Sequence, residues 1–273
     1  MNKIHPNATF SYNLIKGSLE KRRQLVSELN ERFFDSIQQS INSGKRTKLG
    51  DLKKIYQEIL PEKKNILISK INSNSIFAGA SNYTYDDYSG DITGVTIEIP
   101  IKNSRIEMKS LPTIMHENTH VLTTLAQPKH TALTQKLNKQ GLLRNDYDNW
   151  YQDYLYKEEN INEDYSENDM ITNIIEATKK FLSGKSLKDK IHYLQDARYQ
   201  LEQEVDAYAE ELKFAKRLEQ VGIKLDEEDL INGNEIYLFK TKIDILKKMI
   251  ADLISKKRQK NFEKYGHINK FRL

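Results

Sequence analysis

Residues 110–128 read SLPTIMHENTHVLTTLAQP and contain the pattern H-E-x-x-H. On an α-helix its two histidines, His116 and His120, leave the same face one turn apart, so both imidazoles can reach one metal ion. Zinc accepts two histidine nitrogens and a carboxylate, and an open fourth position makes such a site catalytic. Glu117 follows the first histidine and is placed to act as a general base toward water at the metal.

The residues around this pattern favour a helix. Ser110 can cap its N-terminus, Pro112 fits its first turn and Pro128 ends it. Several apolar residues give the helix faces to bury, namely Ile114, Met115, Val121, Leu122 and Leu125. The alternative is a partly buried helix with two surface histidines that form an ordinary polar pair.

The composition limits the kinds of protein that this chain can be. Its 273 residues suffice for one large domain or for two lobes around a shared cleft. The net charge of +4 comes from 43 basic and 39 acidic residues that alternate along the chain, so we expect no nucleic-acid partner. The sequence has no cysteine, so a zinc site must use histidine, glutamate or aspartate.

The sequence predicts no membrane partner and no cleaved export signal. The N-terminus lacks the continuous apolar region of a secretory signal peptide, and no window approaches a transmembrane helix in length. We therefore expect a cytoplasmic protein or one that is secreted without a cleaved signal. The oligomeric state has no signature in the sequence.

Apolar residues recur at helical spacing through most of the chain. This spacing predicts helices at residues 17–42, 50–60, 168–182, 186–220 and 234–262, and a mainly helical segment at 130–157. Residues 63–72 fit either a helix or a strand. Gly184 and Gly222 are predicted to end two of the helices, and residues 158–168 form an acidic loop.

Residues 75–103 have a different pattern, which predicts a strand, a turn and a second strand. The clearest strand is residues 95–101, and Pro100 places its end at a sheet edge. A peptide substrate can add to such an edge as an extra strand. The alternative is an ordinary hairpin that covers the H-E-x-x-H helix.

Together these patterns predict an α+β fold that is predominantly helical. A small β-sheet precedes the H-E-x-x-H helix, and a helical lobe follows it. We expect a single domain over residues 1–273, composed of N-terminal helices at 1–72, the sheet and the H-E-x-x-H helix at 73–128, and the helical lobe at 129–273.

A zinc site of this kind needs a third ligand from the protein. Ala126 stands six residues after His120, so a third histidine at that spacing is excluded. The remaining option is a glutamate from a later helix. Glu202 and Glu176 are the leading candidates, and Glu204 is also open.

The segment that begins at Glu202 resembles a known motif. Glu202, Val205, Asp206 and Ala209 read E-x-x-V-D-x-x-A, with valine where alanine is usual. This is similar to the E-x-x-A-[DN]-x-x-A ligand helix of gluzincin metallopeptidases of the CAAX-prenyl-protease and HtpX type, and of IrrE-like proteins. The resemblance implies a zincin-like core in which Glu202 is the third zinc (Zn2+) ligand. Asp206, one turn later, would then accept a hydrogen bond from the outer nitrogen of a zinc histidine.

The resemblance implies a zinc-dependent metalloendopeptidase that acts on a protein or peptide substrate. Glu117 would take a proton from water and return it to the leaving amine. His192, Tyr193 and Tyr199 are candidates for stabilising the oxyanion. In style, a small cysteine-free helical chain with H-E-x-x-H is similar to effector metalloproteases that bacterial pathogens deliver into host cells. The alternative is a non-catalytic regulatory or binding protein that retains a zincin core.

Overall fold

The computed structural model describes residues 19–43, 65–70, 80–85, 92–99, 108–126, 145–156, 166–225 and 233–265. This part of the chain is predominantly helical, as predicted. Among the helices that it describes, none combines the length and the hydropathy that crossing a membrane would require. The chain divides into two compact units: unit 1 contains residues 1–132 and 206–232, and unit 2 contains residues 133–205 and 233–273.

Helix α1 (Leu19–Asn42) belongs to unit 1 and confirms the helix predicted at residues 17–42. Its buried apolar side chains recur at helical spacing, at Val26, Leu29, Phe33, Phe34 and Ile37. Phe34 stacks on Phe214 of helix α7 (Leu187–Gln220), with ring centroids 4.7 Å apart. This aromatic pair joins α1 to the part of α7 that belongs to the same unit.

Three short strands form a sheet in unit 1: β1 (Asn65–Lys70), β2 (Ala80–Tyr85) and β3 (Ile92–Ile99). The order β1-β3-β2 places β3 in the centre, parallel to β1 and antiparallel to β2. The prediction that the strand near Pro100 lies at a sheet edge is therefore wrong. β3 ends at Ile99, one residue before the proline in the sequence.

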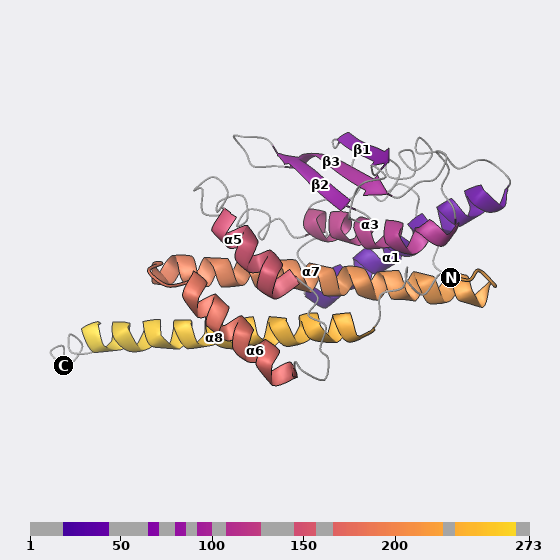
Figure 1. Cartoon of the computed structure of the whole chain (residues 1–273). Helices are drawn as coiled ribbons and strands as arrows, with labels where there is room; N and C mark the ends of the chain where they lie inside the picture. Colours follow the sequence, from indigo (N-terminus) through magenta and orange to yellow (C-terminus); the bar gives the residue numbers. More distant parts are fainter. Residues whose placement is uncertain are drawn as a thin grey trace. The chain divides into compact units, whose positions relative to one another are not determined.

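Helix α3 (Leu111–Ala126) carries the H-E-x-x-H pattern, as predicted, and follows a short 3-10 turn, η2 (Met108–Ser110). It contacts α1 on one side and strands β2 and β3 on another (Figure 1). Its buried apolar side chains are Leu111, Ile114, Met115, Val121 and Leu122. Packing against both a helix and a sheet fixes the rotation of α3 about its axis, and hence the direction of its histidines.

Unit 2 contains the first part of α7 together with α5 (Asn145–Trp150), the π-helix η3 (Tyr151–Tyr156), α6 (Glu167–Phe181) and α8 (Gly233–Tyr265). Its core is aromatic. Trp150 stacks on Phe181 with ring centroids 4.6 Å apart, and its indole N–H donates to Thr178. Tyr147 and Tyr151, which lie close to Trp150 in the sequence, are also buried in this core.

Polar groups define the ends of the unit 2 helices. Ser166 caps α6, because its hydroxyl accepts from the backbone N–H of Asp169 while the Asp169 carboxylate accepts from the backbone N–H of Ser166. Gly184 follows α6 with a φ of 72° and Gly222 follows α7 with a φ of 84°. Both glycines end helices as predicted. The helix predicted at residues 50–60 and most of the acidic loop lie outside the described residues.

Candidate metal centre

His116 and His120 direct their outer ring nitrogens to one place beside α3. The two Nε2 atoms lie 3.1 Å apart. His116 is buried and His120 is partly exposed. Two nitrogens that each lie about 2.0–2.1 Å from a tetrahedral zinc ion are separated by about 3.3 Å. The observed separation therefore suits a cation shared by both rings.

Glu211 on α7 sets the tautomer of His116. Its Oε2 atom accepts a hydrogen bond of 2.9 Å from Nδ1 of His116, and both side chains are buried. An ionised carboxylate can only accept, so Nδ1 must carry the proton. In the neutral ring Nε2 then keeps its lone pair, which is the form that a metal ligand requires.

Tyr208 gives His116 a second contact with α7. The two rings meet edge to face with centroids 4.6 Å apart, and Tyr208 is buried. Tyr208 lies three residues before Glu211, so both side chains leave the same face of the helix. Two side chains from one turn of α7 thus contact His116.

Glu204 completes a group of three side chains that can hold a metal ion. One carboxylate oxygen of Glu204 and one ring nitrogen each of His116 and His120 all lie within 4.8 Å of one another. Two imidazoles and one carboxylate are the donor set of a catalytic zinc site with an open fourth position.

Glu202, the predicted third ligand, is not part of this group. Its Oε1 atom lies 3.5 Å from Nε of Arg198, one turn earlier on α7. Residues 202 and 204 are about 200° apart around a helix, so they point to opposite sides. Glu176, the other leading candidate, is exposed on α6. The geometry favours Glu204, and a zinc bond from Glu202 stays a prediction of the family motif.

The sequence predicts that Asp206 supports a zinc histidine. The Oδ2 atom of Asp206 accepts a 2.8 Å hydrogen bond from Nε of Arg23 on α1. Burial raises the pKa of this carboxyl group above its ordinary value, while the bond to Arg23 opposes the shift. The carboxylate that supports His116 is Glu211. Asp206 joins α7 to α1, and its support of His120, with which it interacts electrostatically, stays a prediction.

The two residues between Glu117 and His120 anchor α3 to its neighbours. Asn30 of α1 donates to the hydroxyl of Thr119 at 2.8 Å and accepts from the side-chain amide of Asn118. Asn30 also donates to Glu210 of α7 at 3.3 Å. Asn30, Asn118 and Thr119 are all buried. The x positions of H-E-x-x-H thus hold the helix in the rotation that turns its histidines toward α7.

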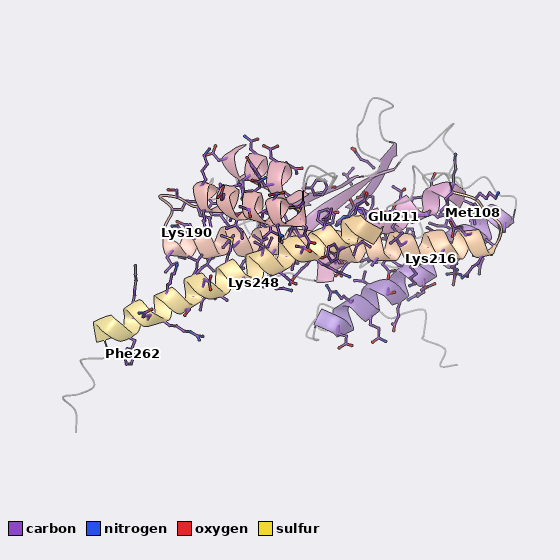
Figure 2. All side chains as sticks on the ribbon, turned by 60° about the horizontal axis from the view of Figure 1, so that its bottom comes forward. Met108, Lys190, Glu211, Lys216, Lys248 and Phe262 are labelled. Carbon is purple, nitrogen blue, oxygen red and sulfur yellow. The ribbon has the colours of Figure 1, made fainter. Side chains whose placement is uncertain are left out.

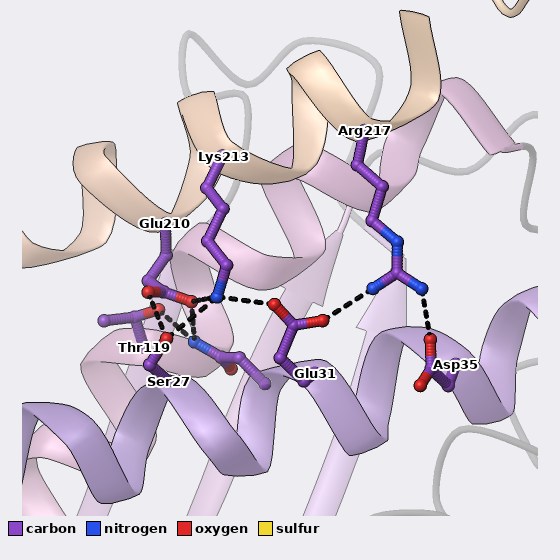
Figure 3. Close-up of polar contacts among 8 residues, drawn as sticks. Ser27, Glu31, Asp35, Thr119, Glu210, Lys213 and Arg217 are labelled. Carbon is purple, nitrogen blue, oxygen red and sulfur yellow. Dashed lines mark hydrogen bonds and ion pairs between the residues drawn. The ribbon is translucent and has the colours of Figure 1, made fainter. Parts of the chain in front are cut away.

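Ion pairs hold α1 against α7 beyond this network (Figure 3). Nζ of Lys213 lies 2.7 Å from a carboxylate oxygen of Glu31, and Arg217 bridges Glu31 and Asp35 at 2.6 and 2.5 Å. The guanidinium of Arg217 also lies over the ring of Phe34, 4.5 Å from its centroid. These contacts fix the position of α7 along the axis of α1. They thereby fix where Glu211 lies relative to His116.

The three predicted oxyanion-stabilising residues all lie on α7. Tyr193 is buried against the rings of Tyr147 and Phe181, with centroids 5.7 and 5.1 Å away. Tyr199 is also buried, and His192 is partly exposed. Tyr193 is therefore a packing residue of the aromatic core.

Sequence patterns missed Tyr208 and Glu211 and gave Glu204 little weight. A signal was nevertheless present, because Glu204, Tyr208 and Glu211 recur at positions i, i+4 and i+7. That spacing places two carboxylates and a phenol on one helical face, where a helix with two histidines can meet them.

Comparison with known proteins identifies no relative. No protein-family model matches the chain, and neither the curated proteins nor the solved structures that were compared give a significant match. The arguments for a function therefore come from the geometry of the metal centre itself.

Proposed function

We propose that this chain is a zinc-dependent metalloendopeptidase of the gluzincin type. The observation that carries the proposal is the convergence of His116, His120 and Glu204, with the two Nε2 atoms 3.1 Å apart and the carboxylate oxygen within 4.8 Å. A structural zinc site commonly has four protein ligands, whereas a catalytic site has three and keeps one position open. The bond from Glu211 to the first histidine supports the same conclusion.

The proposed roles follow from where each side chain lies. When zinc is bound, it polarises a substrate carbonyl and lowers the pKa of water at the site. Glu117 is 6% exposed and directly follows the first ligand, so its carboxylate can take a proton from the attacking water and pass it to the leaving amine. Glu211 keeps the proton of His116 on Nδ1 throughout.

The substrate in this proposal is an extended protein segment. Such a segment can bind by adding a strand to an exposed sheet edge. Because β3 is central, the edges of the described sheet are β1 and β2. The peptide would therefore pair with one of these two strands.

Metal analysis tests the ligand assignment. Zinc content is measured by elemental analysis on the full wild-type chain and on Glu204→Gln, Glu202→Gln and Glu176→Gln variants prepared without chelators. We expect about one zinc per chain in the wild type, loss in Glu204→Gln and retention in the other two. Loss in Glu202→Gln alone would assign the ligand to the family motif. A wild type that takes up no zinc would refute the proposal.

Activity is tested separately with Glu117→Gln. Wild type and variant are incubated with a broad peptide library, and cleavage is followed by mass spectrometry. We expect the variant to keep its zinc and to lose cleavage, since the general base alone has been removed. A wild type that binds zinc but cleaves no library member would instead favour a non-catalytic regulatory or binding protein.

A further inference from the structure

Unit 2 contains a long trough between α6 and α8 with an apolar floor. The trough includes a cavity of about 670 Å³, and six apolar side chains form its floor: Ile171, Ile175, Leu182, Ile245, Met249 and Leu253. Four of the six, two on each helix, are partly exposed. Partly exposed apolar side chains that are contiguous mark a surface that can bind another molecule.

Lysines predominate among the charged side chains that line the cavity, and two of them, Lys190 and Lys248, are labelled in Figure 2. The charged side chains that line the cavity are Lys179, Lys190, Lys248, Lys256, Asp244 and Asp252. Nζ of Lys247 lies 3.3 Å from the carboxylate of Asp244, which compensates one of the two negative charges. The rim of the trough is therefore positive.

A neighbouring cavity of about 470 Å³ lengthens the trough. It shares Lys190, Leu253 and Lys256 with the first cavity and adds Lys260 without any acidic side chain. Along α8 the lining side chains thus run from Thr241 to Lys260, which corresponds to about 28 Å at 1.5 Å per residue. That length exceeds what a small ligand fills and equals about five turns of a helix.

We propose that this trough binds an amphipathic helix of a partner protein, with aliphatic residues on its inner face and acidic residues on its flanks. Ile245, Met249 and Leu253 recur every four residues and form a ridge of the kind that packs into the groove of a second helix. The lysine rim matches acidic flanks in charge. A concave trough suits a helix better than the flat surface of a membrane. The proposal does not depend on the metal centre.

The test uses a synthetic peptide and the full chain. A fluorescein-labelled helical peptide of about 20 residues carries leucine at helical spacing and glutamate on both flanks, and its binding is measured by fluorescence anisotropy. We expect saturable binding at micromolar concentrations. Lys248→Glu/Lys256→Glu and Leu253→Asp should each weaken it at least about tenfold.

A matched control separates the trough from general charge attraction. Lys240→Glu/Lys257→Glu makes the same charge change at two exposed positions of α8 that do not line the trough. We expect its affinity to stay within about twofold of the wild type, and a peptide with lysine in place of glutamate to bind at least about tenfold more weakly. Circular dichroism establishes that each variant is folded.

Any of the following results would overturn the proposal. One is the lack of saturable binding, and equal weakening by both double variants would have the same meaning. Another is that vesicles of phosphatidylcholine and phosphatidylserine displace the peptide from the wild type, which would assign the trough to a membrane surface. The last is a dimer in sedimentation velocity that Leu253→Asp dissociates, which would assign the trough to a second copy of the chain.

Discussion

Glu211 and His116 are joined by a 2.9 Å hydrogen bond although 95 residues separate them in the chain. The bond places a buried negative charge behind a buried imidazole, which holds the ring in one orientation and one tautomer. A histidine on an isolated helix would rotate about two side-chain bonds. The first ligand of the proposed centre is therefore preorganised by a different helix from the one that carries it.

Replacing Glu211 with leucine should lower zinc affinity by about 10–100-fold, because Nδ1 of His116 loses its acceptor. Glu211→Gln should have a smaller effect, since its side-chain carbonyl can still accept. Competition with a chromophoric chelator measures both affinities. Glu219→Leu, at an exposed position of the same helix, is the control. Unchanged affinity in Glu211→Leu would mean that the carboxylate does not support a ligand.

Replacing Asn30 with alanine should destabilise unit 1 by about 1–3 kcal/mol, because it removes the partner of two buried side chains on α3. Urea unfolding followed by circular dichroism measures the change in the free energy of unfolding. Asn42→Ala, at an exposed position near the end of α1, should have little effect. If the two variants were equally stable, the buried network would have no part in holding α3.

Replacing Arg217 with alanine should destabilise unit 1 by about 1 kcal/mol at low ionic strength, because two partly exposed ion pairs are lost. Between about 0.05 M and 1 M salt the loss should shrink, since mobile ions screen such pairs. A remainder should persist at high salt from the contact with Phe34. Urea unfolding at both salt concentrations measures the salt-dependent and the salt-independent loss of stability. Lys216→Ala, at an exposed position, is the control. A loss that does not depend on salt would show that packing alone accounts for it.

Asp169 should make the stability of unit 2 depend on pH in acid. The Ser166 hydroxyl donates to its carboxylate and the Ser166 backbone N–H adds a second bond, so the pKa lies below its ordinary value of 3.8. A lowered pKa stabilises the fold above pH 3.8, and this contribution is lost as the pH falls through the folded-state value.

Asp169→Asn should therefore melt at a lower temperature than the wild type at neutral pH. The difference should narrow as the pH falls below about 3.8, where the wild-type carboxylate also becomes neutral. Thermal melts followed by circular dichroism measure it, and Asp153→Asn, at an exposed position of η3, is the control. A difference that stays constant down to the lowest pH would contradict this assignment.

The helices of this fold were predictable because their signals are local. Apolar spacing identifies α1, α6, α7 and α8, and a glycine with positive φ, such as Gly222 at 84°, ends a helix because it lacks a Cβ atom. The order of the strands was not predictable from the same evidence. Pro100 limits its own hydrogen bonding, but β3 ends one residue earlier and its two neighbours come from elsewhere in the chain.

The metal centre shows the same division between local and distant information. His116 and His120 share one face of one helix, so spacing alone brings them together. The choice between Glu202 and Glu204 depends on how α7 is rotated against α3. Contacts such as that of Glu211 with His116, which are 95 residues apart, set that rotation. No short motif contains that information.

Unit 1 is built from two separate stretches of the chain, residues 1–132 and 206–232, and this has a consequence for its synthesis. At a synthesis rate of about 5–20 residues per second, Glu211 is added about 5–20 s after His116. During that interval all of residues 133–205 are translated, and the nascent α1 and α3 have no α7 on which to pack. A chain truncated before Gln220 would carry both histidines in an incomplete unit 1. The metal centre therefore cannot assemble until both separate stretches of unit 1 have been synthesised.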